Sequence, residues 1–369
     1  MIKPSQIPYD MVCGGTIDSG EMTELFDMAL IKADVAGFAK RKAASAENGK
    51  LRGIGFGMYL EQCGNGADDG VDIEFQDDGR VILHGSQQCN GQGHQTTVTQ
   101  ILSDRLGYDA DLITVKQGDS SRSPRGTTGG ARMTAVLGSA TAVAAAKIID
   151  LAKPFAAKAM ECGEDDLNFT DGLFSRQDTN RSIAIEDLVR QLATSGEKHR
   201  LNWAQPYETD GATYPYGCHI IELEIDRQTC AVDIASYHVV DDFGIIINPL
   251  TLEGQIHGGI AQGVGQALLE HVVYDDSGQL LAGSLMDYAL PRADHFPRFQ
   301  ISTRNTACAN NALGIKGSGE AGAIGAPQAV ISAICDALDI THIDMPATPL
   351  AIFNAMKAKT ANSPVHEGE

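Results

Sequence analysis

The sequence predicts an α+β protein with two similar lobes, each a mixed β-sheet packed with helices. Apolar residues recur at three- and four-residue steps in some segments and at two-residue steps in others. In each half of the chain, a strand hairpin is followed by a glycine-rich stretch and a helix. The stretches Gly91-Gln92-Gly93-His94 and Gly254-Gln255-Ile256-His257 echo each other after these hairpins. We therefore interpret the chain as a duplicated α+β unit.

Composition narrows the class of protein. The chain has 369 residues, 43% hydrophobic and 21% charged, which is typical of a globular protein with one large or two smaller domains. A net charge of −20 argues against partners such as nucleic acid or an anionic membrane surface. The eight cysteines form no C-x-x-C pair, which argues against local zinc or iron–sulfur sites. Disulfides are not expected in a reducing compartment. No signal peptide or membrane-length apolar run is evident, so we expect a cytoplasmic protein.

The first part of the chain reads as a series of alternating elements. We expect a helix over 23–46, then strands over 52–61, 71–76 and 80–85, the last two joined at Asp77-Asp78-Gly79. A helix from His94 to Leu106, a strand over 111–116 and a long alanine-rich helix from Met133, broken or kinked at Pro154, should follow.

The second part is expected to repeat this order after a polar stretch with one short helix over 185–193. Strands over 217–225 and 230–240 lead to a helix that starts after the Gly254–Gly259 stretch and ends near Glu270. The resulting division is an irregular segment and helix (1–50), a first lobe (51–162), a connector (163–213), a second lobe (214–361) and a disordered tail (362–369).

Four glycine-rich segments each read as the opening of a helix: 91–94, 129–134, 254–259 and 317–325. Helix starts present free N–H groups and a positive dipole end, so four of them predict a pocket for a large anionic ligand. Gln92 and Gln255 could read the edge of a heterocycle or bind a phosphate or metal-oxo group, although loop capping explains them equally well. Arg132 could hold a phosphate through bidentate donation or form a surface ion pair.

One carboxylate, Glu320, lies among the last set of glycines. If it is buried, its pKa would rise and it could act as a general base; as a carboxylate at a helix start, its pKa would instead be lowered by the dipole. Gly317, Gly319 and Gly322 also match the G-x-G-x-x-G dinucleotide fingerprint, but the expected early βαβ context is missing. His94 and His257 are expected to be local hydrogen-bond partners, and no set of metal ligands is predicted.

The order of the motifs resembles a known family. GQGH-x-T-T is followed by GD-S…G-T-x-GG-x-R-x-T, then NP…EGQIHGG, then KG-x-GE-x-G. This series is similar to the molybdenum hydroxylases, the superfamily of xanthine dehydrogenase, aldehyde oxidase and carbon monoxide dehydrogenase. The likeness is to the C-terminal half of a carbon-monoxide-dehydrogenase-like large subunit and spans most of residues 50–340.

The resemblance implies a cofactor and roles for individual residues. The cofactor would be molybdopterin carrying molybdenum, in the cytosine dinucleotide form. Glu320 matches the essential glutamate of the family and would be the catalytic base. The cofactor-binding positions implied are Gln92, Gly93, His94, Gly130, Ala131, Arg132, Met133, Gln255, Gly317 and Gly319.

The resemblance also implies partners, because the molybdenum subunit of the family is considerably longer than this chain. We expect the missing N-terminal half, an iron–sulfur subunit with [2Fe-2S] clusters and an FAD subunit. The substrate would be a small carbonyl compound, an N-heterocycle or CO, oxidised with water as the oxygen source. Two alternatives remain open: a non-catalytic module that holds or assembles the cofactor, and a nicotinamide-binding dehydrogenase based on the lone fingerprint.

Overall fold

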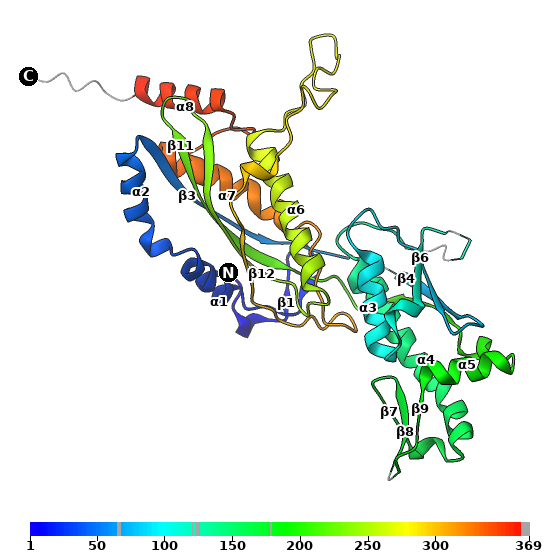
Figure 1. The fold of residues 1–369 in the computed structure, drawn as a ribbon. Coiled ribbons are helices and arrows are strands. Elements are labelled where there is room, and N and C mark those ends of the chain that lie inside the picture. Colours follow the sequence, from blue (N-terminus) through cyan, green and yellow to red (C-terminus); the bar gives the residue numbers. More distant parts are fainter. Residues whose placement is uncertain (65–67, 120, 123–125, 178, 363–369) are drawn as a thin grey trace, which may run out of the picture.

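The computed structural model describes residues 1–64, 68–119, 121–122, 126–177 and 179–362. Within these ranges the chain forms two four-stranded mixed sheets, two smaller sheets and eight α-helices, which confirms the predicted α+β class. The two large sheets lie in two adjoining bodies (Figure 1). Near the N-terminus the two-residue strands β1 (Tyr9–Asp10) and β2 (Thr16–Ile17) pair with each other.

The sheet of the first body has the strand order β10-β4-β5-β6. The bounds are β4 (Asp68–Phe75), β5 (Val81–Gly85), β6 (Ile113–Gln117) and β10 (Trp203–Glu208). Its core packs against α3 (His94–Leu106) and α4 (Ser139–Met160), both close to the predicted bounds. A short π-helix, Thr134–Gly138, precedes α4, and α4 continues through Pro154.

The sheet of the second body has the order β13-β12-β11-β3. Its strands are β3 (Lys50–Leu60), β11 (Tyr216–Asp226), β12 (Val232–Asp242) and β13 (Gln300–Thr303). Helices α6 (Pro249–Leu268) and α7 (Ala321–Leu338) share one apolar core with this sheet, and α1 (Met22–Lys32) contributes to another.

Helix α7 lies directly on β3 because alternate residues of that strand are glycines. A Cβ at Gly53, Gly55 or Gly57 would lie 1.9–2.1 Å from a backbone carbonyl oxygen of α7. Side chains alternate between the two faces of a strand, so this spacing leaves one face of β3 bare. The alanines of α7 occupy that space.

The two sheets repeat the same plan and exchange their edge strands. Each has a hairpin (β4–β5 or β11–β12), a helix (α3 or α6), a strand parallel to the hairpin's second strand (β6 or β13) and a second helix. Strand β3 precedes the first hairpin but pairs with β11, and β10 precedes the second hairpin but pairs with β4. The sequence placed residues 51–61 with the first lobe; their strand pairs in the sheet of the second body.

Residues 163–213, expected to be a connector, form part of the first body. They contain a three-stranded sheet of β7 (Leu167–Thr170), β8 (Leu173–Arg176) and β9 (Ser182–Ala184), then α5 (Ile185–Thr194) and β10. Helix α5 matches the predicted short helix. Its apolar side chains join the core of the first body, so this segment contributes to packing as well as linkage.

Two helix boundaries differ from the prediction. The single helix expected over 23–46 is divided into α1 and α2 (Phe38–Glu47), because Asp34 adopts a left-handed backbone with φ of 46°. Helix α6 begins at Pro249 and not after Gly259. Asn248 caps it by accepting a hydrogen bond from the backbone N–H of Thr251, and proline suits the first helical position.

The segment 254–259 was therefore wrongly predicted to open a helix, since it lies inside α6. Its glycine Gly259 serves helix packing: a Cβ there would lie 2.9 Å from the Cα of Gly322 on α7. A Cβ on Gly322 would in turn lie 2.5 Å from the backbone nitrogen of Ile260. These glycines let α6 and α7 approach closely. Gly322 thus has a packing role within a helix.

Helix α8 (Pro349–Asn362) ends the described chain; of the tail predicted to be disordered, residues 363–369 lie outside the described residues. Two segments are long and apolar enough to cross a membrane by length and composition alone, Thr134–Met160 and Ala321–Leu338. No apolar run of this length was expected from the sequence. Most of each is buried inside the protein, as in the core helices of a globular fold.

Candidate active site

The predicted site residues meet in one pocket between the two bodies. The pocket encloses about 830 Å³, including solvent at its mouth. Three loops and helix α6 line it, and these segments are far apart in the sequence. They contribute Gln92 and His94 at the start of α3; Thr128 to Thr134 before α4; Gln255 on α6; and Lys316 to Glu320 before α7. Of the predicted positions, Gly93 alone does not line the pocket.

Gly93 has a structural position instead. It is the N-cap of α3, with φ of 77°, a conformation that glycine adopts without steric cost. A Cβ at this position would lie 3.1 Å from Cγ2 of Thr251. The start of α3 in the first body therefore touches the start of α6 in the second body.

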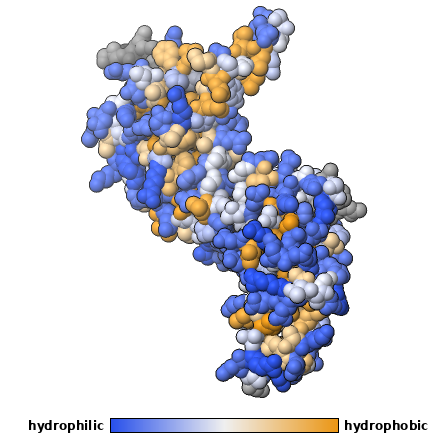
Figure 2. Space-filling view, turned by 45° about the vertical axis from the view of Figure 1, so that its right-hand side comes forward, coloured by the Kyte–Doolittle hydropathy of each residue, from blue (hydrophilic) through white to orange (hydrophobic). Residues whose placement is uncertain are grey.

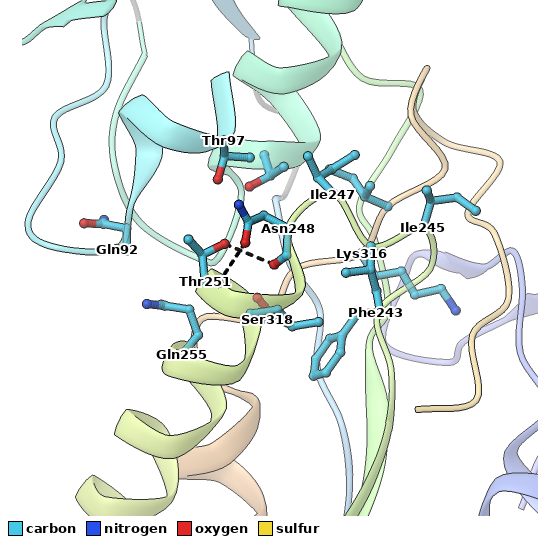
Figure 3. A pocket seen from close by; sticks show the side chains of 14 residues that line it. Gln92, Thr97, Phe243, Ile245, Ile247, Asn248, Thr251, Gln255, Lys316 and Ser318 are labelled. Carbon is cyan, nitrogen blue, oxygen red and sulfur yellow. Dashed lines mark hydrogen bonds between the residues drawn. The ribbon is translucent and has the colours of Figure 1, made fainter. Parts of the chain in front are cut away.

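An adjoining pocket continues the space toward the first turn of α6. Gln92, Gln255, Lys316 and Ser318 line both pockets, and Thr251, Asn248 and Ile247 line the adjoining one. Figure 3 shows Gln92 on the loop before α3 and Gln255 on α6, both beside this space. It also shows the hydrogen bond that Asn248 accepts from Thr251. Gln255 reaches the site from the second turn of α6, although the sequence placed it in a loop.

The loop Gly129–Arg132 is shaped by two residues with positive φ, Gly130 at 55° and Ala131 at 47°. The carbonyl oxygen of Gly130 accepts a hydrogen bond from the backbone N–H of Gly64, 3.0 Å away. Ala131 packs on the next loop: a Cβ at Gly317 would lie 2.6 Å from the carbonyl oxygen of Ala131 and 2.6 Å from Sγ of Cys63. Only glycine fits at position 317.

Backbone N–H groups at the start of α3 stabilise negative charge. Although partial burial opposes it, hydrogen bonds from the backbone of residues 91–94 lower the pKa of the exposed Cys89 thiol. Cys89 itself does not line the pocket. The same set of N–H groups can hold a phosphate oxygen, as helix starts commonly do.

His94 is buried and neutral. Burial lowers its pKa to about 4, and its Nδ1 lies 3.4 Å from Nε2 of Gln117. His257 lies outside the pocket on α6, where it pairs with Glu253 at 3.6 Å and packs its ring on Phe299. Both histidines thus have the local partners that were expected. In the described part of the chain, no group of three His, Cys, Asp or Glu side chains could hold a metal ion.

Glu320 is the N-cap residue of α7, and its side chain is exposed at the pocket wall. The burial that was one of the two expectations for Glu320 is therefore not found, and its position matches the other, a carboxylate at a helix start. The carboxylate makes no capping hydrogen bond. Two residues behind the loop, Glu61 and Cys63, lie within the field of the Glu320 charge. Burial raises the pKa of both the Glu61 carboxyl and the Cys63 thiol, and the charge of Glu320 adds to both increases.

Sequence reasoning missed Lys316, Glu61 and Cys63. Lys316 belongs to the KG-x-GE motif, but its role appears only in three dimensions: its buried ammonium binds the buried carboxylate of Asp242 at 2.9 Å. Glu61 and Cys63 follow β3, and no sequence motif marks them. The hydrogen bond from the backbone N–H of Gly317 to Oγ1 of Thr213, at 3.2 Å, also holds the loop before Glu320.

Comparison with known proteins identifies the family of the chain. The profile of the molybdopterin cofactor-binding domain matches residues 29–297. The chain belongs to this family. The resemblance to the molybdenum hydroxylases is thereby confirmed, and the chain is a molybdopterin-binding domain of the carbon monoxide dehydrogenase and xanthine dehydrogenase type.

Individual relatives are similar over nearly the whole chain. The carbon monoxide dehydrogenase large chain of Hydrogenophaga pseudoflava is 31% identical, covering 96% of this chain and 47% of the relative. The nicotine 6-hydroxylase large subunit of Paenarthrobacter nicotinovorans is 31% identical, covering 95% and 46%. The structure of reconstituted CO dehydrogenase from Oligotropha carboxidovorans matches with a TM-score of 0.90 and 28% identity, covering 98% and 48%. The chain thus spans about half the length of these relatives.

The residues around the pocket suit the cofactor of the family. Its lining carries two primary amides and the Arg132 guanidinium. The neighbouring backbone N–H groups of residues 91–94 lower the pKa of the Cys89 thiol, so they favour negative charge at the start of α3. At Gly317, where a Cβ would clash, the absence of a side chain lets the loops lie against each other. This donor set matches a ligand that combines a heterocycle with phosphate groups.

Proposed function

We propose that this chain is the C-terminal molybdopterin-binding portion of a molybdenum hydroxylase. The observation that carries the proposal is the convergence of four separated segments on one pocket that also holds Glu320. The reaction would be oxidation of a small carbonyl compound, an N-heterocycle or CO, with water as the oxygen source. The names of the relatives support this range, because one acts on carbon monoxide and another on nicotine.

Each part of the pocket has a proposed role toward the cofactor. The N–H groups at the start of α3 and the Arg132 guanidinium would hold the pyrophosphate of molybdopterin cytosine dinucleotide. Gln255 would donate to and accept from the pterin and its metal-oxo group. Gln92 caps its own loop, because its Oε1 accepts a hydrogen bond from the backbone N–H of Asn90 at 2.5 Å, so it would use its Nε2 as a donor. The other proposed contacts are His94, Gly130, Ala131, Met133, Gly317 and Gly319, with Gly93 shaping the start of α3. The bound cofactor would supply the redox chemistry of hydroxylation.

Glu320 is the proposed general base. Its exposed carboxylate at the pocket wall would accept the proton of the water-derived nucleophile as that nucleophile attacks the substrate carbon. A positioned base of this kind typically contributes about 10²–10⁴-fold to the rate. The cofactor-binding side chains lie across the same pocket, so the substrate would approach between them and Glu320.

The complete enzyme would contain more polypeptide than this chain. We assign it a partner that corresponds to the rest of the relatives' length, together with an iron–sulfur subunit carrying [2Fe-2S] clusters and an FAD subunit that remove the electrons. The chain's net charge of −20 fits a cytoplasmic complex without nucleic acid or membrane as a partner.

A second candidate function is a module that holds or assembles the cofactor without catalysis, motivated by the half-length of the chain. Molybdenum and pterin analysis of the complex purified from its native host separates the two. The enzyme proposal predicts molybdenum near one atom per chain together with substrate turnover. Full activity without molybdenum contradicts it, and stoichiometric molybdenum without turnover in the complete complex favours the second candidate.

A further inference from the structure

Between α6 and β13 the chain leaves the second body and projects into solvent (Figure 1, yellow). We call residues 269–291 the apolar arm. Apart from an isolated bridge between Tyr274 and Leu280, it contains no strand or helix. Residues 271–281 are all exposed, and none of the arm's side chains belongs to a hydrophobic core.

The arm exposes many large apolar side chains. Met286 is 93% exposed and Leu285 is 77% exposed. Further members of the set are Val272, Val273, Tyr274, Leu280, Leu281 and Leu290. Figure 2 shows apolar residues along the projecting part at the upper right. A concentration of this kind marks an interaction surface, and aromatic residues and methionine are enriched at the centres of such surfaces.

The arm has a defined shape despite its exposure. At its tip, the Asp275 carboxylate accepts hydrogen bonds from the backbone N–H groups of Ser277 and Gln279, each at 2.9 Å. At its base, the hydroxyl of Tyr288 donates to Oε2 of Glu270 at 2.6 Å. A preformed arm loses little conformational entropy when it docks, which favours binding.

The negative charge of the apolar arm limits the kind of partner that can bind it. It carries four carboxylates, Glu270, Asp275, Asp276 and Asp287, and no lysine or arginine. Two copies of the arm packed together would bring these acids face to face, and an anionic lipid surface would repel them. The partner surface must therefore be apolar and bordered by basic groups.

The length of the relatives indicates which polypeptide carries the partner surface. The match to the carbon monoxide dehydrogenase large chain covers 96% of this chain but only 47% of that relative. The relative therefore contains about as much additional polypeptide as this chain has. We infer that the apolar arm is the docking surface for the polypeptide that corresponds to the uncovered part of the relatives. This inference rests on the proposed function in taking the domain to work beside that polypeptide.

Photo-crosslinking in the native host tests the inference. A benzoylphenylalanine replaces Met286 in one variant and Ile31, a 79% exposed residue on α1, in the control variant. We expect a cross-link from position 286, and none from position 31, to a polypeptide similar to the uncovered part of the relatives. A cross-link from position 286 to a second copy of this chain, to lipid or to nothing overturns the inference.

A binding measurement with the polypeptide so identified gives the magnitude. Leu285→Ser with Met286→Ser should weaken association by roughly 30-fold or more, as expected for hot-spot residues, while Ile31→Ser leaves it unchanged. The melting temperature of both variants should match the unmodified chain, because these side chains contact no core. Equal affinities overturn the inference. Molybdenum content is a separate readout: arm-dependent assembly without molybdenum would refute the proposed function and leave the docking surface standing.

Discussion

Nζ of Lys316 lies 2.9 Å from Oδ2 of Asp242, and both side chains are fully buried beside the loop that leads to Glu320. The same ammonium donates to Oγ1 of Thr306 at 3.1 Å and lies 5.1 Å from the ring centroid of Tyr216. Asp242 also accepts a hydrogen bond from the backbone N–H of Gly244. This buried pair connects the end of β12 to the loop before Glu320.

Breaking the pair should destabilise the protein strongly. Lys316→Met leaves Asp242 buried without its cation, which typically costs about 3–5 kcal/mol. The matched control is Lys147→Met, which removes the exposed partner of Asp150 at 3.7 Å and should cost less than about 1 kcal/mol. Urea unfolding of both variants measures the difference. Similar small losses in both would show that the buried pair does not hold the loop.

Asp241 should make stability depend on pH. It is fully buried, accepts a hydrogen bond from the hydroxyl of Tyr59 at 2.9 Å, and burial raises its pKa to about 8. Because this pKa is higher in the folded state, the folded protein holds the proton more tightly than the unfolded chain does. This contribution to stability is complete below the unfolded pKa, about 3.9, and is lost progressively as pH rises to about 8. The neighbouring His219 has a pKa lowered to about 3 by burial, so it stays neutral over this range.

The measurement is urea unfolding between pH 5 and 8 for the unmodified chain and Asp241→Asn. The difference in unfolding free energy between the two should change by up to about 1.4 kcal/mol per pH unit, with the unmodified chain losing stability as pH rises. Taking the difference cancels the titration of other histidines. A difference independent of pH would mean that Asp241 is ionised throughout.

Part of this architecture could be predicted from sequence, and part could not. The hairpin β4–β5 and helices α3 and α5 follow from local periodicity and turn residues, and they were predicted nearly to the residue. The edge-strand exchange is not local. Strand β3 pairs with β11, and its bare glycine face accepts α7, which lies 268 to 280 positions along the chain, counting from Gly57 to Gly325 and from Gly53 to Ala333. No pattern within β3 specifies that partner.

The sequence motifs predicted the residues that share the pocket, but not the packing and ion-pair contacts that hold them in place. Glycines were read as turns in 254–259 because glycine serves both turns and close helix packing, and only the contact with Gly322 distinguishes the two. Lys316 stood in a recognised motif, yet its partner Asp242 lies 74 positions away. Long-range ion pairs of this kind leave no periodic trace in a sequence.

Cys89 should be unusually reactive for an exposed thiol. The backbone N–H groups around it lower its pKa, so a larger fraction is thiolate at neutral pH. We expect iodoacetamide at pH 7 to modify Cys89 faster than the exposed Cys13, as followed by peptide mass spectrometry. Inorganic pyrophosphate should slow labelling of Cys89 alone by competing for the same N–H donors. Equal rates at the two cysteines would contradict this account of the loop.

Two neighbouring glycines allow a matched test of the pocket wall. Gly317→Ala places a Cβ 2.6 Å from both the Ala131 carbonyl and the Cys63 sulfur, so it should cost about 1–3 kcal/mol and reduce bound molybdenum. Gly319→Ala meets Ala131 alone, at 3.4 Å from its Cβ and 3.7 Å from its Cα, which are ordinary contacts, so the stability of the fold should be unchanged. Unfolding curves of the two variants provide the comparison. Equal effects would show that the loops are not packed as described.

If Glu320 is the base of a molybdenum hydroxylase, turnover by Glu320→Gln in the complete complex should fall sharply. Glu47→Gln, at an exposed position at the end of α2, is the control. We expect a loss of about 10²–10⁴-fold in kcat for Glu320→Gln with molybdenum and pterin content nearly unchanged, and no effect of the control. Turnover that persists in Glu320→Gln, or activity that falls only in step with lost cofactor, would contradict this role of Glu320.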